Sequence, residues 1–103
     1  MIDIEKLRVA LQDFAAARDW DKYHSPKNLA MAMSVEMAEL MEHFEWLSEE
    51  QSLSLDDEAR QAVALEMADV LIYLVRMADR CGVDLDTAVQ QKLLLNAEKY
   101  PAE

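Results

Sequence analysis

The chain has 103 residues, 52% of them hydrophobic, and a formal net charge of −11. This length allows one domain, and the hydrophobic content favours a folded protein over a disordered one. The acidic surplus disfavours nonspecific binding to nucleic acids or to anionic membranes, because both need a basic surface.

The residue composition favours an all-α protein. One Gly, two Pro and seven Met accompany many good helix formers. No apolar run approaches the roughly 20 residues of a membrane span. The single cysteine, Cys81, cannot form an internal disulfide, and the chain opens without a signal segment. We therefore expect a cytoplasmic protein.

The first half of the chain predicts two helices. The first runs from about residue 4 to residue 18, with Leu7, Leu11 and Phe14 on one side. Residues 19–24 interrupt the apolar pattern. Ser25 and Pro26 then supply an N-cap and a proline at the first helical position. The second helix should continue to about residue 46.

The second half predicts two more helices. Residues 47–55 are expected to form a loop, with a turn of helix begun by Ser48 and Gln51. The longest helix should run from residue 56 to 81 and end at Gly82 in a left-handed conformation. Asp84 can cap a last helix that ends before Pro101. Four helices with short connections predict a four-helix bundle, and so small a domain gains from sharing apolar faces with a second copy.

Two acidic pairs of equal spacing stand within these apolar helices: Glu36-x-x-Glu39 in the second and Glu66-x-x-Asp69 in the third. A spacing of three places both members of a pair on one helical face. Between residues 62 and 78 the third helix is apolar apart from one stripe, formed by Glu66, Asp69, Tyr73 and Arg76. A helix that is apolar nearly all round is normally enclosed by protein, so its carboxylates have little access to water.

Four carboxylates that converge between two helices repel one another unless a cation joins them. Mg²⁺ is the expected cation, with Mn²⁺ as a substitute, because every proposed ligand atom is oxygen. A di-iron site is disfavoured, since His43 is the one helical histidine. Zinc is disfavoured because Cys and His do not cluster. The alternative is that the pairs are solvated surface charges, as expected for Glu42, Glu45, Glu49 and Glu50.

Aromatic and cationic residues supply further parts of a ligand site. Rings that could wall a pocket, or simply pack, are Trp20, His24 and Trp46. Polar side chains at a spacing of four and three, which could instead form surface salt bridges, are Lys92, Asn96 and Lys99. Together with a carboxylate-bound metal, rings and cations are what is needed to hold a nucleoside triphosphate.

The sequence resembles the MazG-like, all-α nucleoside triphosphate pyrophosphatases, and within them the dCTP pyrophosphatase branch. The resemblance rests on the two acidic pairs and on the stretches 14–20, 24–29, 44–46, 66–73 and 96–101. It covers the chain in order. At position 99, however, the branch more often has Arg, whose fork geometry Lys99 lacks.

This resemblance implies a single MazG-like nucleotide pyrophosphohydrolase domain over residues 1–103. It implies Mg²⁺-dependent hydrolysis between the α and β phosphates of a nucleotide, with dCTP or modified dCTP favoured, in nucleotide-pool sanitation. It implies a homo-oligomer, a tetramer built as a dimer of dimers. The catalytic metal ligands would be Glu36, Glu39, Glu66 and Asp69. Nucleoside contacts would come from Trp20, His24, Trp46, Tyr73 and Asn96, and phosphate contacts from Lys92 and Lys99.

Two other functions stay open at the level of the sequence. One is a nonenzymatic helical interaction module, acidic enough to mimic nucleic acid, in which all four carboxylates would face outward. The other is a nucleotide-binding sensor that does not turn its ligand over.

Overall fold

A computed structural model describes residues 2–102, and these residues form helices and no strand. The five α-helices are α1 (Ile4–Ala17), α2 (Pro26–Glu42), α3 (Glu49–Ser52), α4 (Asp57–Cys81) and α5 (Leu85–Lys99). A 3-10 helix, η1 (Asp21–Tyr23), lies between α1 and α2. The all-α class expected from the composition is confirmed.

The helix ends lie where the capping residues predict them. The side chains of Ser25, Asp56 and Asp84 each accept a hydrogen bond from a backbone N–H in the first turn of the helix that follows. Ser48 and Gln51 form a reciprocal capping box, so the predicted turn of helix is α3. Gly82 ends α4 with a φ of 70°, a conformation that favours glycine.

α2 is shorter than expected, because it ends at Glu42 rather than near residue 46. The next residues form turns, in which the N–H of Phe44 bonds to the carbonyl of Met41 and that of Leu47 to the carbonyl of Phe44. Trp46 within these turns is 87% exposed. The extended backbone of Ser48, which α3 needs for its cap, redirects the chain before a further turn of α2 forms.

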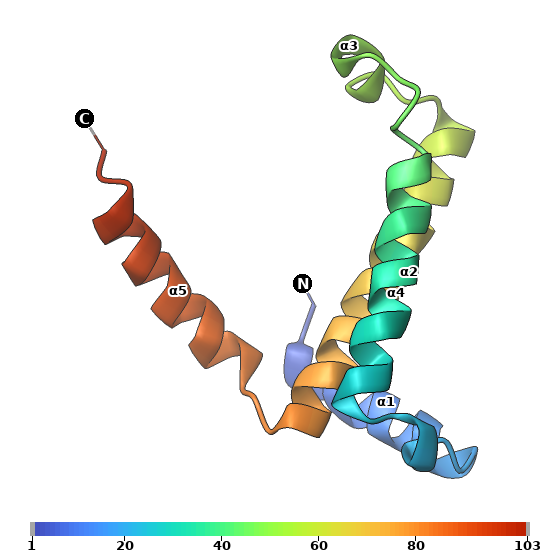
Figure 1. Cartoon of the computed structure of the whole chain (residues 1–103), viewed down its shortest axis with the longest axis vertical. Helices are drawn as coiled ribbons and strands as arrows, with labels where there is room; N and C mark the ends of the chain where they lie inside the picture. The colour runs from blue at the N-terminus through green and yellow to red at the C-terminus, as the bar shows by residue number, and fades with distance from the viewer. Residues whose placement is uncertain (1, 103) are drawn as a thin grey trace.

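The core lies where α1 crosses the antiparallel pair α2 and α4 (Figure 1). Its buried apolar side chains are Ala15 from α1, Leu29 from α2, and Val75 and Ala78 from α4, while Val63 is buried nearer the start of α4. This packing fixes the register between α2 and α4, the two helices that carry the acidic pairs.

The predicted four-helix bundle does not close within one chain. α5 leaves the α4 end at the turn around Gly82 and extends away from α2 and α4 (Figure 1). It has no buried side chain, and Val89, Leu93 and Leu94 on it are exposed. The bundle prediction assumed that the last helix folds back onto the others. A short turn and an unburied apolar helix give an arm instead.

No helix among residues 2–102 is both long enough and apolar enough to span a membrane.

Candidate metal centre

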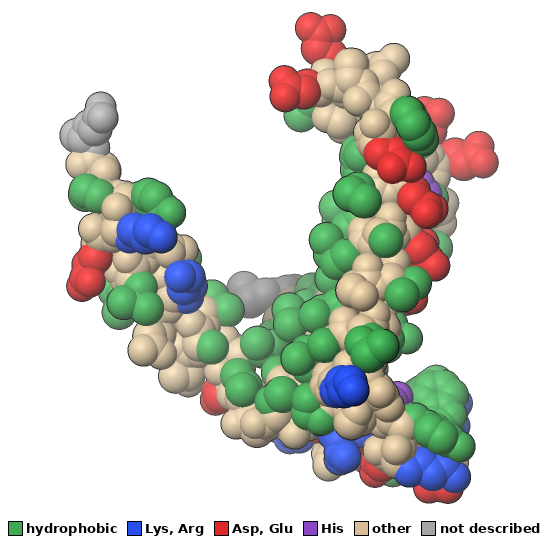
Figure 2. Space-filling model, viewed as in Figure 1, with side chains coloured by type: hydrophobic (Ala, Val, Ile, Leu, Met, Phe, Trp, Pro, Cys, Tyr) green, Lys and Arg blue, Asp and Glu red, His purple; other side chains and the backbone are tan. Residues whose placement is uncertain are grey.

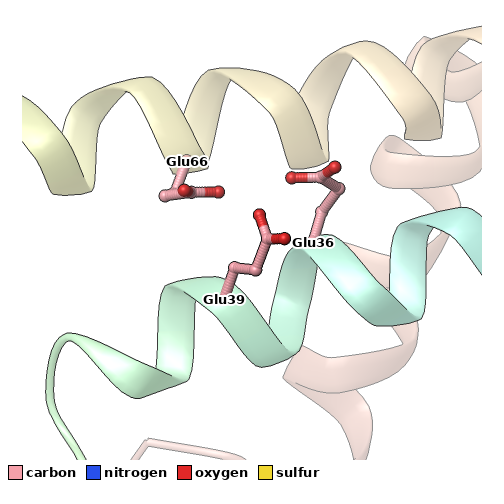
Figure 3. Close-up of side chains that lie close together, drawn as sticks. All are labelled: Glu36, Glu39 and Glu66. Carbon is pink, nitrogen blue, oxygen red and sulfur yellow. The ribbon is translucent and has the colours of Figure 1, made fainter.

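Three of the four predicted metal ligands meet between α2 and α4. Glu36 and Glu39 lie one turn apart on α2, and Glu66 approaches them from α4 (Figure 3). Each residue offers one carboxylate oxygen, and these three oxygens all lie within 4.8 Å of one another. The spacing within α2 and the packing of α4 therefore produce a compact cluster of negative charge, called here the carboxylate cluster.

Two oxygens of the carboxylate cluster have no hydrogen-bond donor. The Oε2 atoms of Glu36 and Glu66 are buried and have no partner among the described residues. Burial raises the pKa of the Glu36 carboxyl, and the charges of Glu39, Asp69 and Glu66 raise it further. A buried carboxylate oxygen without a donor destabilises the fold, so the arrangement is suited to a bound cation.

The donor set decides which kind of cation fits. Glu36, Glu39 and Glu66 contribute oxygen alone, which is the preference of hard divalent cations. Structural and catalytic zinc sites use histidine or cysteine ligands, and neither type belongs to this cluster. A hard divalent ion held by α2 and α4 is therefore the group that these residues can bind.

The buried oxygens also separate the carboxylate cluster from ordinary surface charge. An acidic protein-binding module would point all four predicted carboxylates outward, but Glu36 and Glu66 each bury an oxygen. Glu39 and Asp69 are exposed. The other glutamates of the region are exposed as well, as expected for solvated charge, namely Glu42, Glu45, Glu49 and Glu50.

Asp69 lies beside the carboxylate cluster rather than inside it. Its charge contributes to the raised pKa of Glu36, so the two carboxylates are near each other. Its side chain also lines an adjacent cavity of about 300 Å³. Asp69 thus stands between the cluster and the cavity, and its role as a ligand stays a prediction.

This adjacent cavity, called here the aromatic cavity, is formed where α1, η1 and the start of α2 meet α4. Of the predicted nucleoside contacts, Trp20, His24 and Tyr73 line it. The Trp20 ring lies edge-on to Phe14 at 5.5 Å between centroids, and 6.0 Å from the His24 ring. Aromatic walls next to the carboxylate cluster can provide a stacking surface for a flat ligand.

Phe14 and Arg76 are among the residues of the aromatic cavity that have no role in the sequence-based prediction. Phe14 carries the cavity wall beyond Trp20, and Arg76 contributes a buried guanidinium. The apolar side of the first helix marked Phe14, and the polar stripe of the third helix marked Arg76. Neither pattern alone distinguishes a cavity wall from ordinary packing.

The other predicted ligand contacts are not brought to the carboxylate cluster within one chain. Trp46 is largely exposed in the turns after α2 and is absent from the aromatic cavity. Lys92 and Lys99 are exposed on α5 and Asn96 is half-buried there. Figure 2 shows cationic side chains on this arm, whereas the side of the α2 and α4 pair that faces the arm is mostly hydrophobic in this view. The expectation that these residues surround one site is therefore not met by a single chain.

A larger cavity of about 500 Å³ lies near the turn between α4 and α5. Ile4, Arg8 and Val83 are among the residues that line it, and none of the predicted site residues does. Its size does not make it the functional site, because the unpartnered carboxylate oxygens lie elsewhere.

Comparison with known proteins assigns the chain to a family. Residues 31–103 match the MazG-like family. The chain is 39% identical to a pyrophosphatase from Archaeoglobus fulgidus whose crystal structure is known, with a TM-score of 0.90 over 99% of this chain and 95% of that one. This all-helical chain belongs to the MazG-like family.

Curated relatives are similar over most of the chain. Human dCTP pyrophosphatase 1 is 43% identical over 101 residues, which are 96% of this chain, and the rat protein is 42% identical over 100 residues, or 95%. The chain spans 59% of the length of each of these relatives. The dCTP pyrophosphatases are thus relatives of this chain within the family.

Replacing Glu36 with Gln tests the carboxylate cluster directly. The variant loses one negative charge, so its melting temperature in EDTA should exceed that of the wild type. Mg²⁺ at about 100 times its Kd should stabilise the wild type by about 2.7 kcal/mol and stabilise the variant much less. Thermal unfolding in EDTA and in MgCl₂ measures both effects. The matched control Glu42→Gln, an exposed carboxylate on α2, should respond as the wild type does. An equal Mg²⁺ response in E36Q would contradict the site.

The raised pKa of Glu36 also predicts how the stability of the metal-free protein depends on pH. Below the ordinary glutamate pKa of 4.5, Glu36 is protonated in both the folded and the unfolded states. Above it, the unfolded chain ionises first, so the folded state loses stability until Glu36 itself ionises. In EDTA, urea unfolding between pH 4 and 8 should show this loss in the wild type and a smaller one in E36Q. Identical pH profiles would argue against the clustered carboxylates.

Proposed function

We propose that the protein is a Mg²⁺-dependent nucleoside triphosphate pyrophosphatase. The observation that carries the proposal is a carboxylate cluster with two buried, unpartnered oxygens, next to an aromatic cavity. The relatives of the chain are named pyrophosphatases, which supports the same chemistry. The reaction converts a nucleoside triphosphate and water into a nucleoside monophosphate and pyrophosphate.

The chemistry follows from where the charges lie. Mg²⁺, when bound, neutralises phosphate charge and stabilises the departing pyrophosphate. Glu36, Glu39 and Glu66 would hold the cation from two packed helices, which would fix its position better than loops would. One of the four carboxylates, with Asp69 included, orients the attacking water and accepts its proton. The water oxygen bonds to the α phosphorus, and the bond from that phosphorus to the α–β bridging oxygen breaks.

The aromatic cavity is the proposed nucleoside site. Trp20 and His24 offer ring faces for the base, and Tyr73 lies on the α4 side. Asp69 lines the same cavity and is close to Glu36, so a ligand seated there can place its phosphates at the metal. The names of the relatives support dCTP or modified dCTP as the favoured substrate, and removal of such nucleotides from the pool as the purpose. The cytoplasm is the proposed location.

Release of pyrophosphate from a panel of nucleoside triphosphates tests this function. The wild type with Mg²⁺ should release pyrophosphate, fastest from dCTP or modified dCTP, and EDTA should abolish release. Glu66→Gln should lower kcat by about 100-fold or more, because it removes one of the metal ligands. The control Glu42→Gln should stay within about twofold of the wild type.

The panel also separates the rival functions. Nucleotide binding without any product would favour a sensor. The assignment fails if pyrophosphate is not released with Mg²⁺, or if folded E66Q and Asp69→Asn proteins both keep full activity.

We further propose that the site is completed by a second copy of the chain, within a homotetramer built as a dimer of dimers. Exposed apolar side chains occur on α2, α4 and α5, for example Met41, Leu65 and Leu94. Exposed apolar side chains on three helices suit an interface between subunits. The arm formed by α5 can then carry Lys92 and Lys99 to the phosphates held at a neighbouring carboxylate cluster. The acidic cluster alone repels phosphate, so cations from a partner would offset its charge.

Mixing two inactive variants tests this sharing. E66Q lacks a metal ligand, and the double variant Lys92→Ala/Lys99→Ala lacks the proposed phosphate contacts. If a site combines α2 and α4 of one copy with α5 of another, mixed oligomers should regain up to about a quarter of wild-type activity, because random pairing of two such variants restores some complete sites. Activity after mixing and refolding measures this recovery. Mixtures no more active than their components would show that each chain forms its own site.

A further inference from the structure

Arg76 is a buried charge that the proposed reaction does not use. It lies on α4, lines the aromatic cavity, and is 4% exposed. Within residues 2–102, no other polar or charged residue is buried to this degree. Burying a guanidinium is unfavourable unless its N–H groups are paired, so its partners indicate what the burial achieves.

The guanidinium bonds to three separate groups. Nη2 donates to Asp21 of η1 at 2.5 Å, and Nη1 donates to Asp79 on the next turn of α4 at 3.3 Å. Nε donates to Nδ1 of His24 at 3.0 Å. Asp79 also accepts a hydrogen bond from Arg8 of α1 at 3.1 Å. Arg76 thus joins α4 to the segment that carries Trp20 and His24.

The bond to His24 determines where the imidazole carries its proton. The Nε atom of an arginine always bears hydrogen, so the Nδ1 of His24 must accept. A neutral imidazole has one acceptor and one donor, so the proton of His24 lies on Nε2. Arg80 donates to the backbone carbonyl of His24 at 3.0 Å, which holds the residue in place from the same helix.

The Nε2–H of His24 is free to bind a ligand. No hydrogen bond to this atom occurs within residues 2–102, and it is not among the buried atoms without a partner. The ring lines the aromatic cavity. An N–H donor at this place fits an acceptor on the edge of a nucleobase, such as a carbonyl oxygen or an unprotonated ring nitrogen.

We propose that Arg76 is a positioning residue that holds His24 as a neutral imidazole with its proton on Nε2, so that the aromatic cavity presents a fixed donor to the base. This inference rests on the proposed nucleotide site. Arg76 does not contact the carboxylate cluster, so its contribution is to substrate binding and not to the chemical step.

The charges around His24 act in the same direction. Burial lowers the pKa of His24, and the positive charge of Arg76 lowers it further. Asp21 opposes this effect, and Arg80 adds to it. The ring is therefore neutral at and above neutral pH, where a positive imidazolium would also repel Arg76.

Ring nitrogen NMR tests the proposal without any need for turnover. The chain has two histidines, so ¹⁵N-labelled His43→Gln protein contains His24 alone. Its ring should show the Nε2–H tautomer and titrate below the ordinary histidine pKa of 6.5. A ring with the proton on Nδ1, or one that titrates above 6.5, overturns the proposal whether or not the protein hydrolyses nucleotides.

Arg76→Met then connects this ring state to substrate binding. In the variant the pKa of His24 should rise, and KM should increase about tenfold while kcat changes by less than about threefold. The matched control Arg60→Met removes an exposed arginine of α4 that does not line the aromatic cavity, so its His24 tautomer and KM should stay near those of the wild type. Unchanged KM in R76M would overturn the proposal, and if R76M does not fold, the ring measurement on H43Q protein still decides it.

Discussion

The packing of α2 against α4 is the constraint on which the rest of the structure depends. It brings Glu36, Glu39 and Glu66 within a few ångströms of one another and buries an oxygen of Glu36 and of Glu66. Hydrophobic contacts elsewhere along the two helices must hold these like charges together. A bound divalent cation removes the repulsion, so metal binding and the stability of this helix pair are coupled.

The same packing places a binding surface beside the charge. α1 crosses the end of the α2 and α4 pair, and the rings of Phe14 on α1 and of Trp20 and His24, which flank η1, line a cavity that also includes Asp69. Arg76 anchors that end through Asp21 and His24. Asp69 connects the two, because it lines the aromatic cavity and its charge acts on Glu36. This is why we propose that the carboxylate cluster and the aromatic cavity belong to one site.

The sequence allowed much of this arrangement to be predicted, because its signals are local. Ser25, Asp84 and Gly82 fix helix ends through bonds within a few residues, and the Glu36–Glu39 spacing sets a shared helical face. The course of α5 could not be predicted in this way. Its apolar residues fit a bundle equally well whether the partner is its own chain or another. The pairing of Arg76 with His24, which are 52 residues apart, likewise depends on tertiary packing.

The most direct test of the account is the location of the metal itself. Crystals of the protein grown with Mn²⁺ should give an anomalous diffraction peak between α2 and α4, at coordination distance, about 2.0–2.6 Å, from oxygens of Glu36, Glu39 and Glu66. An ion at that place would show that the buried, unpartnered oxygens are ligands. A peak confined to other residues, or three carboxylates left without an ion at saturating Mn²⁺, would contradict the central claim.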